Sequence, residues 1–99
     1  MKMRSEKAIE NDIKRYIDSL GGWWIKIHGG SNNPSTGVPD LLACINGTFV
    51  AIEVKRSSGG VVSAIQLEQI KRINKAGGVA FVAESLKTVK DELTKHNII

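Results

Sequence analysis

The sequence has little of the features that define several protein classes. It contains one cysteine, Cys44, in 99 residues, which excludes a disulfide framework and predicts a reducing compartment. Its longest apolar stretches, Leu41–Ile45 and Phe49–Ile52, are far shorter than the ~20 residues of a membrane-spanning helix. No apolar segment follows the basic N-terminus, so we expect no secretory signal and a cytoplasmic location, in a bacterial cell or a virus-infected host cell.

Composition and length indicate one soluble globular domain over residues 1–99. Hydrophobic residues make up 41% and charged residues 24% of the chain, which excludes a disordered chain and a coiled-coil rod. Fourteen basic residues against ten acidic ones give a net charge of +4. This modest excess is compatible with an acidic partner such as nucleic acid.

Hydrophobic periodicity and turn residues predict the order helix, strand, hairpin, helix, strand, helix. Both runs of the hairpin are largely apolar on both faces, which suits a central sheet with helices on each side. We therefore expect an α/β fold, a three-layer α/β/α sandwich around a mixed sheet. The predicted elements are a helix from Ser5 to Gly21, a strand over Trp23–Ile27, hairpin strands over Asp40–Ile45 and Thr48–Lys55, a helix from Ser63 to about Ala76, a strand over Val79–Ala83 and a helix from Ser85 to about Asn97.

The Asn46-Gly47 pair between the hairpin runs fixes a testable register. Both residues accept the positive φ of a two-residue hairpin turn. Such a turn places Asp40 directly opposite Glu53, and Lys55 points to the same face because strand side chains alternate. A three-residue loop with a bulge would break this register, so the loop length is the critical assumption.

Two carboxylates at this separation suggest a metal site. Like charges about 5 Å apart repel by about 3 kcal/mol at an effective dielectric constant of 20, and fold stability has no need of that arrangement. Carboxylate oxygens suit Mg²⁺ or Mn²⁺, and the backbone carbonyl of Val54 is a further candidate ligand. With Asp40 and Glu53 as ligands, such a metal suits phosphodiester hydrolysis.

A lysine beside this pair has three possible catalytic roles. Lys55 can orient a water nucleophile, accept its proton if its pKa is lowered, or stabilise charge on the phosphoryl group. The sequence does not choose among these roles.

Pro39-Asp40, twelve intervening residues and Glu53-Val54-Lys55 resemble the PD-(D/E)xK nuclease signature. The wider sequence is similar to the VRR-NUC family of that restriction-endonuclease-like superfamily. Its small stand-alone members, of virus and phage type, resemble Holliday-junction resolvases. The further matching segments are Ser5-Glu6, Gly37 to Leu42, Ala51 to Lys55, Ser63 with Gln66, and Gly77-Gly78.

The resemblance implies a homodimeric, Mg²⁺- or Mn²⁺-dependent endonuclease that is selective for DNA structure, with branched DNA such as Holliday junctions as substrate. Two alternatives stay open: a non-catalytic DNA-binding or recombination accessory protein, and a nuclease subunit that needs a targeting partner. The intact Asp-Glu-Lys set argues against the first, because clustered carboxylates do not favour phosphate binding.

The resemblance also implies a site glutamine at Gln66 and an acidic residue in the first helix. We expect Glu6 there, because a helical wheel places it near the middle of the apolar stripe, with Glu10 as its rival at the edge of the stripe. Gln66 has a second interpretation, since it occupies the third position of a Ser63 capping box. Cys44, between apolar residues, is expected in the core.

Other residues flank the site elements and are expected to contact the DNA backbone. They are Lys14, Arg15, Lys26, Ser31, Asn32 and Arg56.

Overall fold

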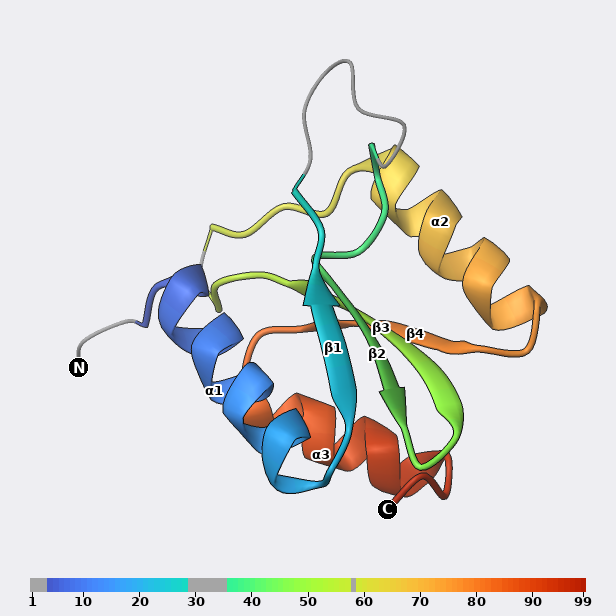
Figure 1. Cartoon of the computed structure of the whole chain (residues 1–99). Coiled ribbons are helices and arrows are strands. Elements are labelled where there is room, and N and C mark those ends of the chain that lie inside the picture. The colour runs from blue at the N-terminus through green and yellow to red at the C-terminus, as the bar shows by residue number, and fades with distance from the viewer. Residues whose placement is uncertain (1–3, 29–35, 58) are drawn as a thin grey trace.

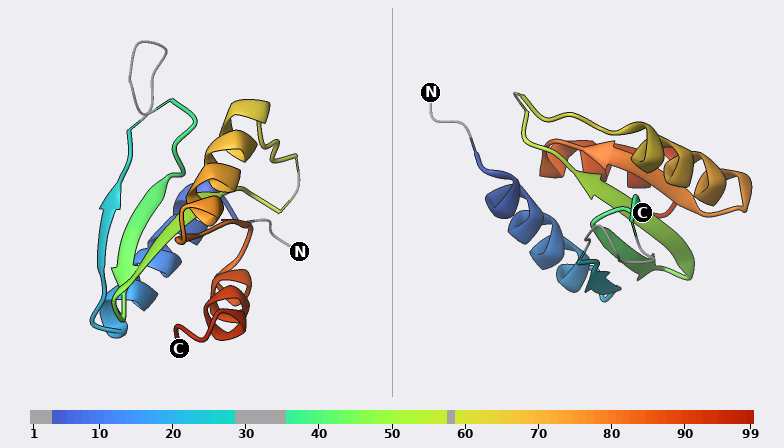
Figure 2. Two further views of the ribbon diagram at one scale, coloured as in Figure 1. Left: turned by 90° about the vertical axis from the view of Figure 1, so that its right-hand side faces the viewer. Right: turned by 90° about the horizontal axis from the view of Figure 1, so that it is seen from above.

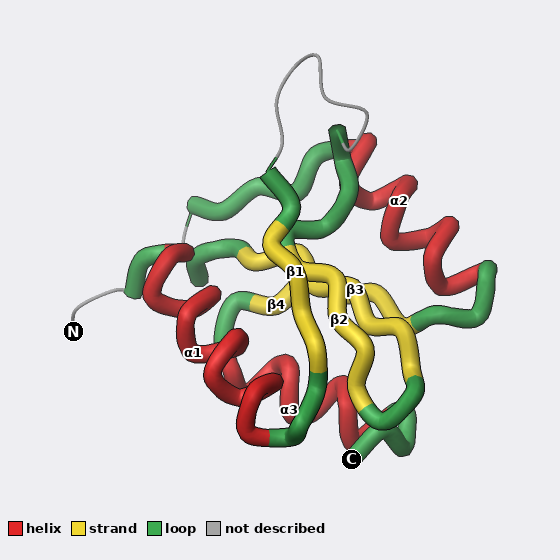
Figure 3. The backbone as a smooth tube through the Cα atoms, in the orientation of Figure 1, coloured by secondary structure: helices red, strands yellow, loops and turns green. Residues whose placement is uncertain are grey.

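The computed structural model describes residues 4–28, 36–57 and 59–99, and its elements follow the predicted order (Figures 1 and 3). Ser31 and Asn32 lie outside the described residues. No helix among the described residues is long and apolar enough to span a bilayer. The elements are α1 (Glu6–Ser19), β1 (Trp23–Lys26), β2 (Leu41–Ile45), β3 (Thr48–Val54), α2 (Ala64–Lys75), β4 (Val79–Ala83) and α3 (Leu86–Lys95).

The four strands form one mixed sheet in the order β1-β2-β3-β4. β1 and β3 run antiparallel to β2, whereas β4 runs parallel to β3. Asn46 and Gly47 have φ values of 50° and 80°, as the tight hairpin turn requires. Leu41 lies opposite Ile52, so the predicted register is confirmed.

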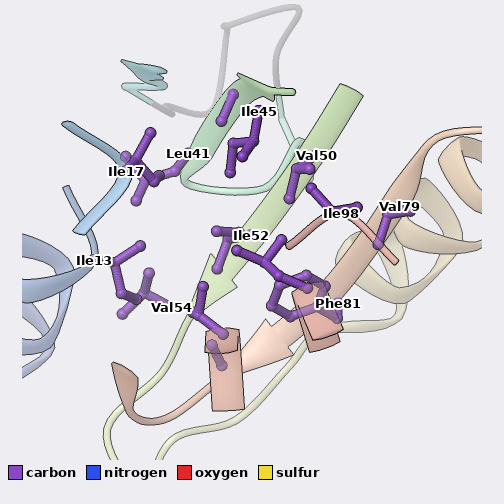
Figure 4. Close-up of a cluster of buried hydrophobic side chains, with 14 of the residues drawn as sticks. Ile13, Ile17, Leu41, Ile45, Val50, Ile52, Val54, Val79, Phe81 and Ile98 are labelled. Carbon is purple, nitrogen blue, oxygen red and sulfur yellow. The ribbon is translucent and has the colours of Figure 1, made fainter. Parts of the chain in front are cut away.

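One face of the sheet packs against α1 and α3 (Figure 2). Alternate residues of β3, among them Val50, Ile52 and Val54, point into this layer. They meet the buried side chains of Ile13 and Ile17 from α1, and Figure 4 shows part of this cluster. This apolar layer anchors the central strands, from which the candidate site projects to the other side.

The opposite face is only partly covered, because α2 packs mainly against β4 and β3. On the side of β1 and β2 that faces the same way, none of the helices within residues 4–28, 36–57 and 59–99 packs. The expectation that Cys44 lies in the core is therefore wrong, since the residue is exposed on this uncovered half. Trp23 is also exposed, whereas Trp24 packs against the core cluster on the other face.

Candidate active site

Asp40 and Glu53 meet at one end of the sheet, as the hairpin register predicts. Asp40 directly precedes β2, and the pairing continues beyond the strand because the Ile27 N–H donates to the Asp40 carbonyl at 2.8 Å. Glu53 is the penultimate residue of β3 and is 1% exposed. Its side chain points to the α2 face, opposite to the apolar core, because it alternates with the core residues on either side of it.

The carboxylate of Glu53 has two polar partners on one oxygen, Oε2, and differs in this from the other oxygen, Oε1. Lys55 Nζ lies 3.2 Å from Oε2, and Gln66 Nε2 donates to the same oxygen at 3.0 Å. Oε1 is buried and has no hydrogen-bond donor among the described residues. A buried carboxylate oxygen without a donor is costly, and a bound cation would satisfy it.

Burial raises the pKa of Glu53 to about 7. The charge of Asp40 and a hydrogen bond to it add to this rise, while Lys55 opposes it. The raised pKa shows that the site is short of positive charge, because Lys55 alone does not offset the desolvation of Glu53 and the charge of Asp40. A divalent cation would reverse the balance.

Asp40 is held through both carboxylate oxygens. Its Oδ2 accepts a hydrogen bond from the Val54 N–H at 2.8 Å, which joins the side chain to the backbone of β3. Its Oδ1 lies 3.5 Å from Lys26 Nζ. Val54, the third candidate ligand, is thereby fixed against Asp40.

The amide of Gln66 serves both functions that the sequence left open. Its Oε1 accepts from the Ser63 N–H at 2.9 Å, and the Ser63 side chain accepts from the Gln66 N–H, which completes the capping box of α2. The remaining end of the amide, Nε2, binds Glu53. The cap therefore points the glutamine at the site.

The two glutamates of α1 exchange the positions expected for them. Glu10 is buried and Glu6 is exposed, so the inward orientation predicted for Glu6 is wrong. Glu6 is the first residue of α1 and extends past the packed part of the helix, where its Oε1 lies 3.4 Å from the Arg56 N–H. Glu10, one turn later, faces the sheet.

Glu10 is surrounded by lysines. Lys26 Nζ lies 2.6 Å from Oε1 and Lys14 Nζ lies 2.9 Å from Oε2. Burial works to raise the pKa of Glu10, but the two lysines outweigh it and lower the pKa. Desolvation likewise opposes the charge of Lys26, yet Glu10 and Asp40 together raise its pKa. Glu10 and Lys26 are therefore both charged at neutral pH.

The predicted DNA contacts divide into two groups. Lys14 and Lys26 are engaged with Glu10, and Lys14 also lies over the Trp24 ring, 4.9 Å from its centroid. Arg15 and Arg56 are exposed at the surface, where they are accessible to phosphate. Arg15 also pairs with Asp12 at 2.7 Å.

The donor set fits a hard divalent cation held by oxygen ligands. Asp40 and Glu53 present carboxylates to one another, and the unsatisfied Glu53 Oε1 marks where positive charge is missing. Within the described ranges, no group of three or more His, Cys, Asp or Glu residues gathers as a metal site. The pair would thus need backbone carbonyls and water to complete the coordination shell.

Sequence reasoning missed the link from α1 to Asp40 through Lys26. It treated Lys26 as a phosphate contact, whereas the structure places its ammonium group between Glu10 and Asp40. The spacing of Glu10 and Lys14, four residues apart in a helix, was an available sign of an ion pair. Nothing local indicates that a residue of β1 reaches the same carboxylate.

Comparison with known proteins gives a consistent family signal. A family model for archaeal Holliday junction resolvases (Hjc) matches residues 1–98. The solved structure of a VRR_NUC domain superposes with a TM-score of 0.73 and 28% identity, and the match covers 94% of this chain and 98% of that one. No match was found among curated protein sequences.

Two further structures are similar. A VRR_NUC domain protein has a TM-score of 0.72 at 16% identity, over 96% of this chain and 89% of that one, which shows the fold alone. The 1.6 Å structure of Archaeoglobus fulgidus Hjc, a Holliday junction resolvase from an archaeal hyperthermophile, has a TM-score of 0.60 and 29% identity. That match covers 78% of this chain and 65% of the Archaeoglobus chain.

Proposed function

The chain belongs to the archaeal Holliday junction resolvase family, and from this membership we propose that it is a metal-dependent, structure-selective DNA endonuclease. It hydrolyses phosphodiester bonds at branched DNA such as Holliday junctions, with Mg²⁺ or Mn²⁺ as cofactor. The observation that carries the proposal is the buried Glu53 carboxylate, which faces Asp40 and keeps one oxygen without a donor from the described part of the chain. A module that only binds DNA gains nothing from such a pair.

The metal would be held by Asp40, Glu53 and the carbonyl of Val54. Bound there, it would polarise a phosphoryl oxygen and lower the pKa of a water nucleophile. The structure places neither Glu6 nor Glu10 in direct contact with Asp40 or Glu53 through the interactions it describes, so a metal-binding role for an α1 glutamate stays a prediction.

Lys55 is proposed as the catalytic lysine. Its ammonium group lies 3.2 Å from Glu53 Oε2 and is largely buried. It has the position to stabilise negative charge on a phosphoryl group bound beside the carboxylates. Gln66 holds the Glu53 carboxylate from the opposite element, α2, so strand and helix together fix the ligand.

DNA binding is proposed to rest on phosphate contacts. Arg15 and Arg56 are exposed, and the net charge is +4. Phosphate contacts carry no base sequence, so affinity should depend on salt and on the shape of the junction.

We propose that the active form is a homodimer in which two equivalent sites cut two strands of one junction. An apolar surface on the α2 side of β1 to β3 supports this assembly. We call this surface the apolar sheet face; it consists of Trp23, Ile25, Leu42, Cys44 and Phe49. Strand pairing places these residues in two neighbouring rows across the sheet, and Asp40 and Glu53 form the next row on the same face.

The apolar sheet face can be tested with a matched pair of substitutions. Ile25 and Ile99 are both 45% exposed, but only Ile25 lies on this face. Ile25→Lys should shift sedimentation toward the monomer, whereas Ile99→Lys should not. Because Cys44 is the only cysteine, a spin label there should report an intermolecular distance. A strict monomer at micromolar concentration would contradict the dimer but not single-strand nicking.

The cleavage activity is tested with labelled four-way junctions, flaps, splayed arms and plain duplex. Each is incubated with Mg²⁺, Mn²⁺ or EDTA. We expect cleavage of branched DNA with either metal and none in EDTA. Binding without cleavage under all metal conditions would favour the accessory protein, and cleavage of every substrate at equal rate would contradict structure selectivity.

A further inference from the structure

Three charged residues from separate parts of the fold form a network of ion pairs that ends on Asp40. Glu10 comes from α1, Lys26 from β1, and Asp40 directly precedes β2. Lys26 Nζ lies 2.6 Å from Glu10 Oε1 and 3.5 Å from Asp40 Oδ1. Glu10 is 5% exposed, so its charge is buried and needs this lysine.

We propose that Lys26 is a positioning residue for the metal-binding carboxylate of Asp40 and that Glu10 holds Lys26 in place. This inference rests on the proposed metal site. Glu10 fixes the ammonium group, and the ammonium group in turn fixes Asp40 Oδ1. The other oxygen, Oδ2, is fixed by the Val54 N–H. Asp40 therefore has one orientation before any metal arrives.

The contacts of Glu10 explain how it holds Lys26. Both Glu10 oxygens have a lysine within 3 Å, but Oε2 has no hydrogen bond of good geometry in the described part of the chain. The shorter of the two contacts is the one to Lys26. A buried carboxylate is costly to leave without its cation, so Glu10 keeps the Lys26 ammonium group beside Asp40.

Substitution of Lys26 should change the affinity for Mn²⁺ in the direction opposite to the one that charge alone would give. Removing a positive charge near two carboxylates would strengthen cation binding if charge alone mattered. If Lys26 orients Asp40, its removal weakens binding, because the ligand must then be ordered at the cost of binding free energy. The sign of the change in Mn²⁺ affinity therefore separates the two roles.

The first measurement needs no metal. In EDTA, the ¹H–¹⁵N signal of Val54 reports the hydrogen bond to Asp40 Oδ2. Lys26→Met should move this signal, although Val54 lies on another strand and is not a sequence neighbour of Lys26. Lys14→Met is the matched control, because Lys14 also pairs with Glu10; it should leave the Val54 signal in place.

The second measurement is calorimetric titration with Mn²⁺. Lys26→Met should weaken binding about fivefold or more, Lys26→Arg should stay within about threefold of the wild type, and Lys14→Met should not weaken binding. Glu10→Gln should weaken Mn²⁺ binding in the otherwise wild-type protein but cause no further loss in the Lys26→Met background. The effects of two substitutions are not additive when one residue acts through the other. The double variant removes the buried Glu10 charge together with the charge of its partner Lys26, so neither is left without the other.

Three results would overturn the positioning role. One is an unchanged or tighter Mn²⁺ affinity in folded Lys26→Met. Another is a further loss of Mn²⁺ affinity from Glu10→Gln in the Lys26→Met background, which would show that Glu10 acts independently of Lys26. The third is an unmoved Val54 signal. If the wild type binds no Mn²⁺ while the Val54 signal still responds to Lys26→Met, the proposed metal function fails and the positioning of Asp40 stands.

Discussion

Gln66 and Glu53 are joined by a hydrogen bond of 3.0 Å that connects the first turn of α2 to the penultimate residue of β3. The same glutamine amide accepts the Ser63 N–H at 2.9 Å. Because α2 has no fully buried residue, this polar contact ties the helix to the sheet where apolar packing is sparse. Helix capping and the orientation of a candidate ligand thus depend on one side chain.

Replacing Gln66 should affect stability and activity together. Gln66→Ala removes half of the capping box and the donor to Glu53, so we expect a loss of about 1–2 kcal/mol in unfolding free energy and weaker Mn²⁺ binding. Ser63→Ala removes the cap but leaves the Gln66 donor in place. Denaturant melts and calorimetry should show a similar stability loss for Ser63→Ala with a smaller loss of metal affinity. Equal metal affinities in the two variants would contradict the link.

The two carboxylates should be required for cleavage but not for DNA binding. Asp40→Ala or Glu53→Ala removes a proposed metal ligand and should abolish cleavage of a four-way junction. Binding in EDTA should persist or rise, because negative charge near phosphate is removed. Gel-shift and cleavage assays on one junction measure both quantities. Wild-type cleavage by either variant would contradict the assignment.

Lys55 should separate metal binding from chemistry. Lys55→Ala keeps both carboxylates and removes one cation, so Mn²⁺ should bind as well as in the wild type or more tightly. Cleavage should fall by about 10²- to 10⁴-fold, the usual loss for one positioned catalytic group. Single-turnover cleavage at saturating Mn²⁺ measures the rate. Normal cleavage would remove Lys55 from the catalytic machinery.

The raised pKa of Glu53 predicts how the metal-free protein responds to pH. Its pKa lies at about 7 in the folded chain, against an ordinary value of 4.5, so the folded state binds the extra proton between these values. Its stabilising contribution is complete below pH 4.5 and is lost as pH rises through 7, with an upper bound on the order of 3 kcal/mol. Denaturant melts in EDTA at pH 5 and pH 8 should show this fall.

Glu53→Gln provides the control for the pH response, because it cannot ionise and should lose that part of the pH dependence. Mn²⁺ should act in the opposite direction. Since the ligand must be deprotonated, wild-type affinity should rise between pH 6 and pH 8. An identical stability profile in the wild type and Glu53→Gln would contradict the raised pKa.

The sequence by itself determined the order of the elements and the pairing of the two carboxylates. Asn46-Gly47 admits a tight turn, and a two-residue turn leaves only one register, in which Asp40 faces Glu53. Strand alternation then adds Lys55 to the same face. Each of these steps depends on one hairpin and its turn, so local geometry is enough.

Only the tertiary structure decided which half of the sheet is covered and which glutamate of α1 turns inward. Cys44 is apolar in its sequence context, yet α2 packs over β3 and β4 and leaves it exposed. Glu10 and Lys26 are sixteen residues apart, and nothing local marks them as partners. Their contact depends on how α1 lies across β1, because packing between distant elements, not periodicity within one, sets which buried charges meet.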